Sequence, residues 1–250
     1  MFDLKFTAIE IISLLLSVPG VFLALSVHEC AHGWMSYKLG DPTARNLGRL
    51  TLNPIKHIDP IGLVCMIFFR FGWAKPVPVN ARYYKKPRRD MALVAAAGPI
   101  SNLLMCLIAV ILVYVSFFIY RCVVTDPYPF WHIWNLWAGV EGLVMPEAFS
   151  GKLIFLIFTF LMNFGMLNAS LAVFNLIPVP PLDGSRIAFI FLPVKFYFGI
   201  MRYERYIQIV LWILIFAGAF DAILSFLVGG IFYGLTDLME LIPIFRFPWY

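Results

Sequence analysis

Long apolar runs dominate the pattern of hydrophobic and polar positions along this 250-residue chain. Several are long enough to cross a bilayer as helices, because a hydrocarbon core of ~30 Å needs ~20 apolar residues in helical conformation. We expect helices at approximately 7–38, 91–120, 151–175 and 206–233. Asp221 interrupts the last run, which is therefore either one tilted span or two shorter pieces. The pattern predicts an all-α polytopic membrane protein, with residues 1–250 as a single membrane-embedded domain.

The stretch between the first two runs, residues 45–85, has a different pattern. Residues 47–52 and 74–80 have the character of short extended stretches, and two prolines punctuate the second. The apolar run 61–69 between them is too short to span a membrane as a helix. We therefore expect a small β-hairpin-like segment that is associated with the membrane or dips into it.

Composition supports a membrane protein and excludes an ordinary soluble domain. Hydrophobic residues make up 62% of the chain and charged residues 13%, whereas soluble domains carry roughly 25% charged residues. The formal net charge of +5 would suggest a nucleic-acid partner in a soluble protein. In this chain the distribution of the basic residues gives a different explanation.

The basic residues are concentrated in two segments. Residues 38–90 hold 11 of the 19 Lys and Arg residues and residues 186–205 hold 4. Both segments fall on one side of the membrane if every clear apolar run spans once, and a basic excess marks the cytoplasmic side. We expect a multi-pass protein of the cell (inner) membrane, with the N-terminus outside and the loop 38–90 in the cytoplasm. Its basic segments would meet anionic membrane lipids, and no nucleic acid is expected.

A candidate metal site lies inside the first apolar run. His28 and His32 are four residues apart, so that a helix places them on one face, and Glu29 follows the first histidine. Two such imidazoles can bind one metal ion, beside a carboxylate that can act on water. The alternative is a packing role, with the histidines bonded to neighbouring helices and Glu29 paired with an arginine. Charged residues at mid-helix cost ~2.5–3.5 kcal/mol each, which favours the metal as a compensating partner.

Catalytic zinc takes three protein ligands and leaves a fourth position open, so a third ligand must come from elsewhere. The candidate is Asp183, which follows Pro178, Pro180 and Pro181. The alternative is that Asp183 caps a helix starting near Ser185. Topology favours the ligand, because the first and third runs cross in the same direction and bring both parts toward one leaflet. The prolines forbid a regular helix, and irregular backbone at membrane depth is tolerated only where protein or a wet cavity covers it.

Four motifs in order carry a family resemblance over most of the chain. They are HECAHGWMSYKLGDPTARNLGRLTLNPIKHIDPIG, GWAKPVPVN, PRRDMALVAAAGPISN and FNLIPVPPLDGSR. The chain resembles the site-2 protease family of intramembrane zinc metalloproteases, most of all its small bacterial members without an added regulatory domain. The resemblance implies a zinc-dependent endopeptidase that cuts membrane proteins or peptides within or near their transmembrane segments. It also implies a core of three transmembrane helices that carries one Zn²⁺ per chain, with one or two further helices.

The resemblance assigns roles residue by residue. It implies His28, His32 and Asp183 as zinc ligands and Glu29 as the catalytic base. Asn102 and Asn175 correspond to polar residues that line the site, bind substrate or stabilise the oxyanion. The alternative for both asparagines is hydrogen bonding between helices, worth ~0.6–2 kcal/mol in membranes.

A zinc-binding transporter or scaffold without proteolytic activity is the main functional alternative. It would use the same ligands, but transport needs exchangeable ligands and no base. Glu29 stands where hydrolysis needs a proton acceptor, which favours the protease.

Overall fold

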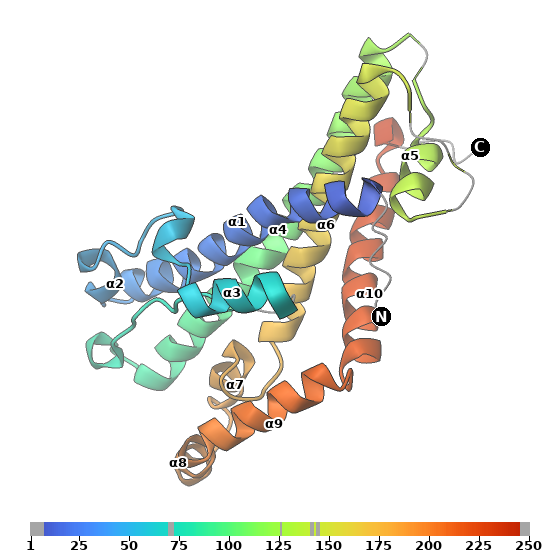
Figure 1. Cartoon of the computed structure of the whole chain (residues 1–250). Helices are drawn as coiled ribbons and strands as arrows, with labels where there is room; N and C mark the ends of the chain where they lie inside the picture. The colour runs from blue at the N-terminus through green and yellow to red at the C-terminus, as the bar shows by residue number, and fades with distance from the viewer. Residues whose placement is uncertain (1–7, 70–72, 126, 141–142, 144–145, 246–250) are drawn as a thin grey trace. The chain divides into compact units, whose positions relative to one another are not determined.

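The computed structural model describes residues 8–69, 73–125, 127–140, 143 and 146–245, and helices dominate them (Figure 1). The helices are α1 (Ala8–Lys38), α2 (Thr43–Asn46), α3 (Pro60–Phe69), α4 (Pro87–Val123), α5 (Phe130–Trp137), α6 (Phe149–Asn175), α7 (Asp183–Ala188), α8 (Val194–Arg202), α9 (Glu204–Phe216) and α10 (Asp221–Glu240). Three short 3-10 helices are η1 (Pro54–Lys56), η2 (Ala81–Tyr83) and η3 (Pro243–Phe245). By length and composition, four stretches can cross a membrane: Leu15–Lys38 within α1, and helices α4, α6 and α10. The expectation of an all-helical, multi-pass membrane protein is confirmed at this level.

The last apolar run forms two helices rather than one. Helix α9 ends at Phe216, and Gly218 adopts a positive φ of 72°, which glycine tolerates at helix ends. The Ala219 N–H then donates to the Leu214 carbonyl at 3.0 Å and closes the turn. At 13 residues α9 is too short to span a bilayer. Among the described residues from Glu204 to Phe245, α10 is therefore the one candidate span.

The predicted β-hairpin-like segment at 45–85 is not found among the residues described there. The segment holds α2, η1, α3 and η2, and its one β contact is an isolated antiparallel bridge between Ile58 and Ala74. Two local causes oppose a hairpin. Pro76 and Pro78 have no N–H, so a ladder cannot extend along 74–80. The Asp59 carboxylate accepts the N–H groups of the next turn, at 3.0 and 2.9 Å, and starts α3.

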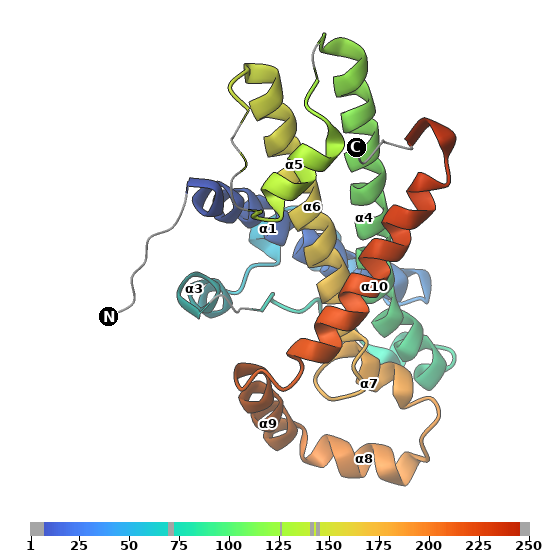
Figure 2. The same ribbon diagram turned by 90° about the vertical axis from the view of Figure 1, so that its right-hand side faces the viewer.

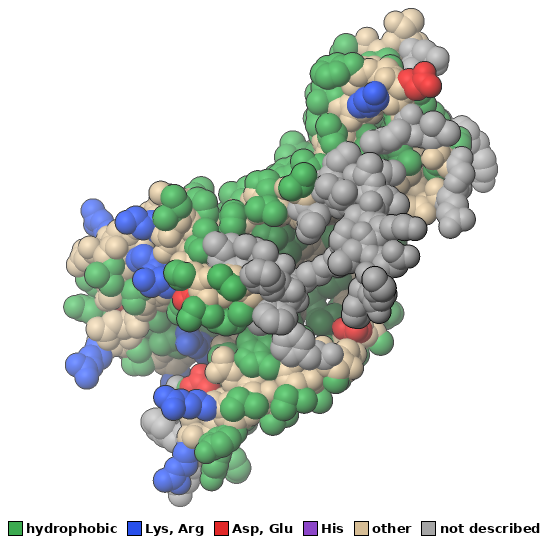
Figure 3. Space-filling model, in the orientation of Figure 1, with side chains coloured by type: hydrophobic (Ala, Val, Ile, Leu, Met, Phe, Trp, Pro, Cys, Tyr) green, Lys and Arg blue, Asp and Glu red, His purple; other side chains and the backbone are tan. Residues whose placement is uncertain are grey.

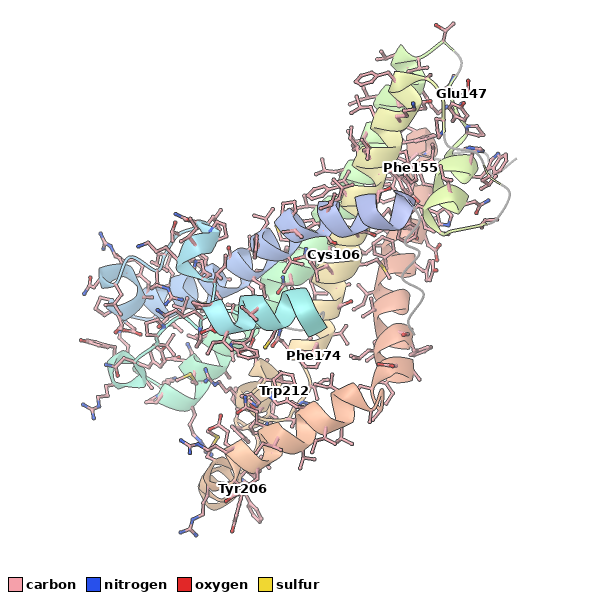
Figure 4. The ribbon with its side chains drawn as sticks, viewed as in Figure 1. Cys106, Glu147, Phe155, Phe174, Tyr206 and Trp212 are labelled. Carbon is pink, nitrogen blue, oxygen red and sulfur yellow. The ribbon has the colours of Figure 1, made fainter. Side chains whose placement is uncertain are left out.

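The chain packs as two compact units. Unit 1 comprises residues 1–21, 105–167 and 229–250, and its described core is largely aromatic. Phe155, labelled in Figure 4, is fully buried there with Phe117 and Phe158. The Tyr114 hydroxyl donates to the Thr236 carbonyl at 3.3 Å, which satisfies a polar group among these rings.

Unit 2 comprises residues 22–104 and 168–228, and it contains every residue of the candidate site. Its helices pack through small buried residues, which are Ala24 of α1, Ala92, Ala95 and Ala97 of α4, and Ala169 and Ala172 of α6. Small side chains let helix backbones approach closely in a membrane. Within this unit, α7 lies between the C-terminal end of α6 and the α8–α9 pair (Figures 1 and 2).

A buried carboxylate ties the end of α1 to the segment before α4. Asp41 is fully buried and accepts hydrogen bonds from the Ser36 hydroxyl at 2.8 Å and the Asn80 N–H at 2.7 Å. Thr43 donates to it through both its N–H, at 2.9 Å, and its hydroxyl. Burial by itself would raise the pKa of Asp41, but these donors favour the charged form and hold the pKa below its usual range.

We expect Asp41 to make the folded chain sensitive to acid. Because its pKa is lower when folded, the stabilisation it gives is present above the unfolded pKa of ~3.9 and is lost as pH falls through the folded value. Melting temperatures of the detergent-purified protein between pH 3 and 7 should therefore fall more steeply for the wild type than for Asp41→Asn. At neutral pH the variant should be less stable by roughly 1–3 kcal/mol, because donors lose their acceptor. Parallel curves for the two proteins would contradict this role.

Candidate metal centre

Two histidines and one aspartate converge at the centre of unit 2. His28 and His32 lie one turn apart on α1, and their Nε2 atoms are 3.0 Å from each other. The Oδ2 atom of Asp183, the first residue of α7, lies 3.2 Å from both Nε2 atoms. The three side chains are only 8, 12 and 14% exposed. Segments far apart in sequence thus bring three potential ligand atoms together.

Hydrogen bonds on the far side of each ring fix the protonation pattern. The His28 Nδ1 atom lies 2.6 Å from the Asn102 side-chain oxygen, and the His32 Nδ1 atom lies 2.7 Å from the Val94 carbonyl. Both partners are acceptors, so both Nδ1 atoms must carry the proton. A neutral imidazole protonated at Nδ1 presents a lone pair at Nε2, and both lone pairs point into the cluster.

The cluster therefore joins three acceptor atoms and needs a positive charge between them. Asp183 Oδ2 is buried, and no donor in the described part of the chain forms a hydrogen bond to it. Ligands bound ~2.0–2.1 Å from a tetrahedral zinc lie ~3.3 Å apart, close to the separations here. Ring N–H groups held by carbonyl oxygens are also usual behind metal-bound histidines. The donor set fits a divalent cation such as Zn²⁺.

The local structure of α7 favours a ligand role for Asp183 over a helix cap. The N-cap position belongs to Leu182, and no side chain caps this helix. Gly184 lets the start of α7 pack on the turn after α6, because a Cβ there would lie 2.2 Å from the Leu176 carbonyl oxygen.

Gly98 of α4 makes room for the two imidazoles. A Cβ atom at this position would lie 2.5 Å from the His32 ring and 2.6 Å from the His28 ring. Such contacts are shorter than real Cβ contacts, so no larger residue fits without moving the rings. The close approach of α4 to α1 at this glycine therefore forms one wall of the centre.

Glu29 is held by the segment 74–80. Its Oε2 atom accepts the Val77 N–H at 2.7 Å. The Arg49 guanidinium donates to the Lys75 carbonyl at 2.7 Å and the Pro76 carbonyl at 3.3 Å, which fixes the same segment. Among the described residues, the Oε1 atom of Glu29 forms no hydrogen bond. This anchoring of Glu29 had no signal in the sequence.

The two predicted asparagines have different surroundings. Asn102 contacts His28, and its amide nitrogen also donates to Asn168 at 2.8 Å and toward the Ala24 carbonyl at 3.5 Å. Asn175 instead donates to the Leu171 carbonyl of its own helix at 2.9 Å, and no hydrogen bond joins it to the cluster. The sequence analysis did not identify Asn168, which is fully buried in the structure. The signal that could have found it is a polar amide inside the apolar run 151–175.

The fold and the site define a class: a multi-pass helical membrane protein with a buried His-His-Asp cluster beside a glutamate. Comparison with known families indicates the same class of protein. The model of peptidase family M50, the site-2 protease family, matches residues 17–218. The chain belongs to this family.

Two relatives illustrate the similarity. "Putative zinc metalloprotease YwhC" of Bacillus subtilis is 42% identical over 167 residues, which are 67% of this chain and 64% of that protein. "Putative zinc metalloprotease Rip2" of Mycolicibacterium smegmatis is 27% identical over 176 residues, which are 68% of this chain and 54% of that protein. The chain thus spans less than two thirds of the length of these relatives. No solved structure matches it.

Proposed function

We propose that the protein is a zinc-dependent intramembrane endopeptidase that hydrolyses peptide bonds within or near transmembrane segments of membrane proteins. The observation that carries the proposal is the meeting of three buried acceptor atoms, from His28, His32 and Asp183, within 3.2 Å of one another. Membership of peptidase family M50 and the names of the relatives support zinc and proteolysis. In this proposal the three residues hold one Zn²⁺ per chain and Glu29 is the catalytic base.

Zinc, when bound, supplies Lewis acidity and lowers the pKa of water toward ~7. The chain's own residues would do the rest. Glu29, oriented by the Val77 N–H, accepts a proton from the attacking water and passes it to the leaving amine. Asn102 keeps His28 in the tautomer that a ligand needs. The side-chain oxygen and the side-chain nitrogen of Asn102 both have hydrogen-bond partners already. We therefore assign Asn102 this orienting role and not a place in the oxyanion hole.

The proposed site lies in a core of three transmembrane helices, α1, α4 and α6, with Asp183 just after the last. The basic segments 38–90 and 186–205 support a cytoplasmic location for the adjoining ends of these helices and an outside N-terminus. The substrate would be a transmembrane protein or peptide, locally unwound so that an extended backbone reaches Glu29. The N–H groups of Lys75 and Val77 already bond His57 and Glu29, which argues against substrate pairing with that edge of 74–80.

Zinc content tests the proposed ligands directly. Detergent-purified wild type, loaded with Zn²⁺ and then freed of excess metal, should hold close to one zinc per chain. His28→Ala and Asp183→Ala should hold at least about tenfold less zinc per chain, since each removes one of three ligands. His132→Ala, outside the cluster, is the control and should keep wild-type zinc. Retention of zinc by Asp183→Ala would exclude this residue as the third ligand.

A further inference from the structure

A cavity lies in unit 2 beside the start of α4. This cavity of about 400 Å³ is open to the surface and is lined by α4, the segment before it, α7 and the α8–α9 pair. Arg88, Arg186 and Glu204 contribute its charged groups, and its apolar wall includes Met91, Phe189 and Met201. The cavity has the size of a small-molecule site and is larger than a single ion needs.

The cavity carries an excess of positive charge. Two guanidinium groups line it against one carboxylate. The Arg88 Nη2 atom donates to the Leu192 carbonyl at 2.6 Å, which orients its guanidinium and leaves further N–H groups for a ligand. Across residues 8–245, apart from the short undescribed gaps, no carboxylate forms a salt bridge with Arg88 or Arg186. Two guanidinium groups that line one cavity and form no salt bridge favour phosphate, which guanidinium binds in bidentate fashion.

The position of the cavity along α4 favours a location at the level of lipid headgroups. Pro87, which lines it, is the first residue of a candidate membrane span. Helix α9, whose first residue Glu204 lines the cavity, also carries Tyr206 near its start, and this ring is 69% exposed (Figure 4). Exposed tyrosine rings are typical of membrane interfaces. Lys and Arg side chains also gather over the parts of unit 2 that carry α2 and α8 (Figure 3).

We propose that this cavity binds one anionic phospholipid, with its phosphate between Arg88 and Arg186. The apolar wall formed by Met91, Phe189 and Met201 would contact the glycerol and the first methylenes of the acyl chains. Basic pockets between membrane helices are known to select such headgroups. Arg186 follows Asp183 by one turn of α7, so the lipid would rest on the helix that carries the proposed ligand. The binding itself does not depend on the proposed catalysis.

Native mass spectrometry of the full chain in mild detergent tests the lipid site. Titration with dioleoylphosphatidylglycerol should show a first lipid bound about tenfold more tightly than dioleoylphosphatidylcholine. Arg88→Gln and Arg186→Gln should each weaken that first binding by about tenfold, the effect of a charge-assisted hydrogen bond. Arg202→Gln is the matched control. Arg202 is exposed, as Arg88 and Arg186 are, but it does not line the cavity. Zinc content of each variant serves as the independent check that the centre remains folded.

Three outcomes would overturn the proposal. Equal losses of affinity for the first phosphatidylglycerol in all three variants would mean that the lipid is attracted to the basic surface in general and not to the cavity. Equal affinity for both lipids would remove the selectivity on which the site is argued. Saturation by millimolar inorganic phosphate, with the same dependence on Arg88 and Arg186 and no gain from phosphatidylglycerol, would assign the cavity to free phosphate.

Discussion

Glu29→Gln should lower the rate of peptide hydrolysis by about 10²- to 10⁴-fold, the contribution of a general base. Glutamine cannot accept the proton from water, but its amide oxygen can still accept the Val77 N–H that holds Glu29 at 2.7 Å. The geometry of the segment 74–80 should therefore persist. The proposed ligands are untouched, so the variant should bind close to one zinc per chain. The measurement is kcat on a single-span test substrate that the wild type cleaves, with metal content determined in parallel.

Cys30→Ala is the control for Glu29→Gln. Cys30 is the next residue of α1, it lies between the two histidines in sequence and it is not in the metal cluster. We expect this variant to keep near-wild-type turnover. Undiminished cleavage by Glu29→Gln would remove the base from the mechanism. A wild-type protein that exchanges bound zinc but cleaves no test substrate would instead favour the alternative function, a zinc transporter.

Gly98→Ala should disable the centre without touching a ligand. The added Cβ would lie 2.5 Å from the His32 ring, and the partners of both rings leave them little freedom to move. Overpacking of this kind costs ~1–3 kcal/mol, and a displacement of reacting groups by 1 Å costs about 10² in rate. We expect zinc affinity to fall by at least about tenfold and turnover by at least about a hundredfold.

Gly230→Ala provides the comparison for Gly98→Ala. Gly230 also lies inside a long helix, but a Cβ there would meet nothing within 4 Å. This change should keep zinc and turnover, and it should stabilise the fold by ~0.4–1 kcal/mol. Equal effects of the two substitutions would show that a glycine in a membrane helix, and not its place above the imidazoles, determines the result.

The sequence predicted those parts of the molecule that follow from local periodicity. The apolar runs 7–38, 91–120 and 151–175 predicted the helices α1, α4 and α6 to within a few residues. The fourth run, 206–233, did not predict its span, because Gly218 separates α9 from α10 and the candidate span is Asp221–Glu240. The helical spacing of His28 and His32 predicted one shared face. Asp183 could be added only because the topology placed it near the same membrane leaflet.

Other parts depend on contacts that no local pattern reports. The Val77 N–H that holds Glu29 is a backbone group, so the choice of valine at this position does not predict the contact. The β-hairpin was predicted from extended-looking residues on both sides of 61–69. The same prolines that suggested extended backbone also removed the donors that a hairpin needs, and Asp59 started a helix in between.

The parts of the metal centre are spread along the chain, and this sets an order for its biogenesis. The ribosome delivers His28, Glu29 and His32 first, with α1. The groups that orient the imidazoles, Asn102 and the Val94 carbonyl, follow with α4. Asp183 emerges only after α6. A nascent chain therefore lacks the proposed third ligand until its third span has been made, so metal loading becomes a late step of membrane insertion and an unfinished chain would carry no hydrolytic activity.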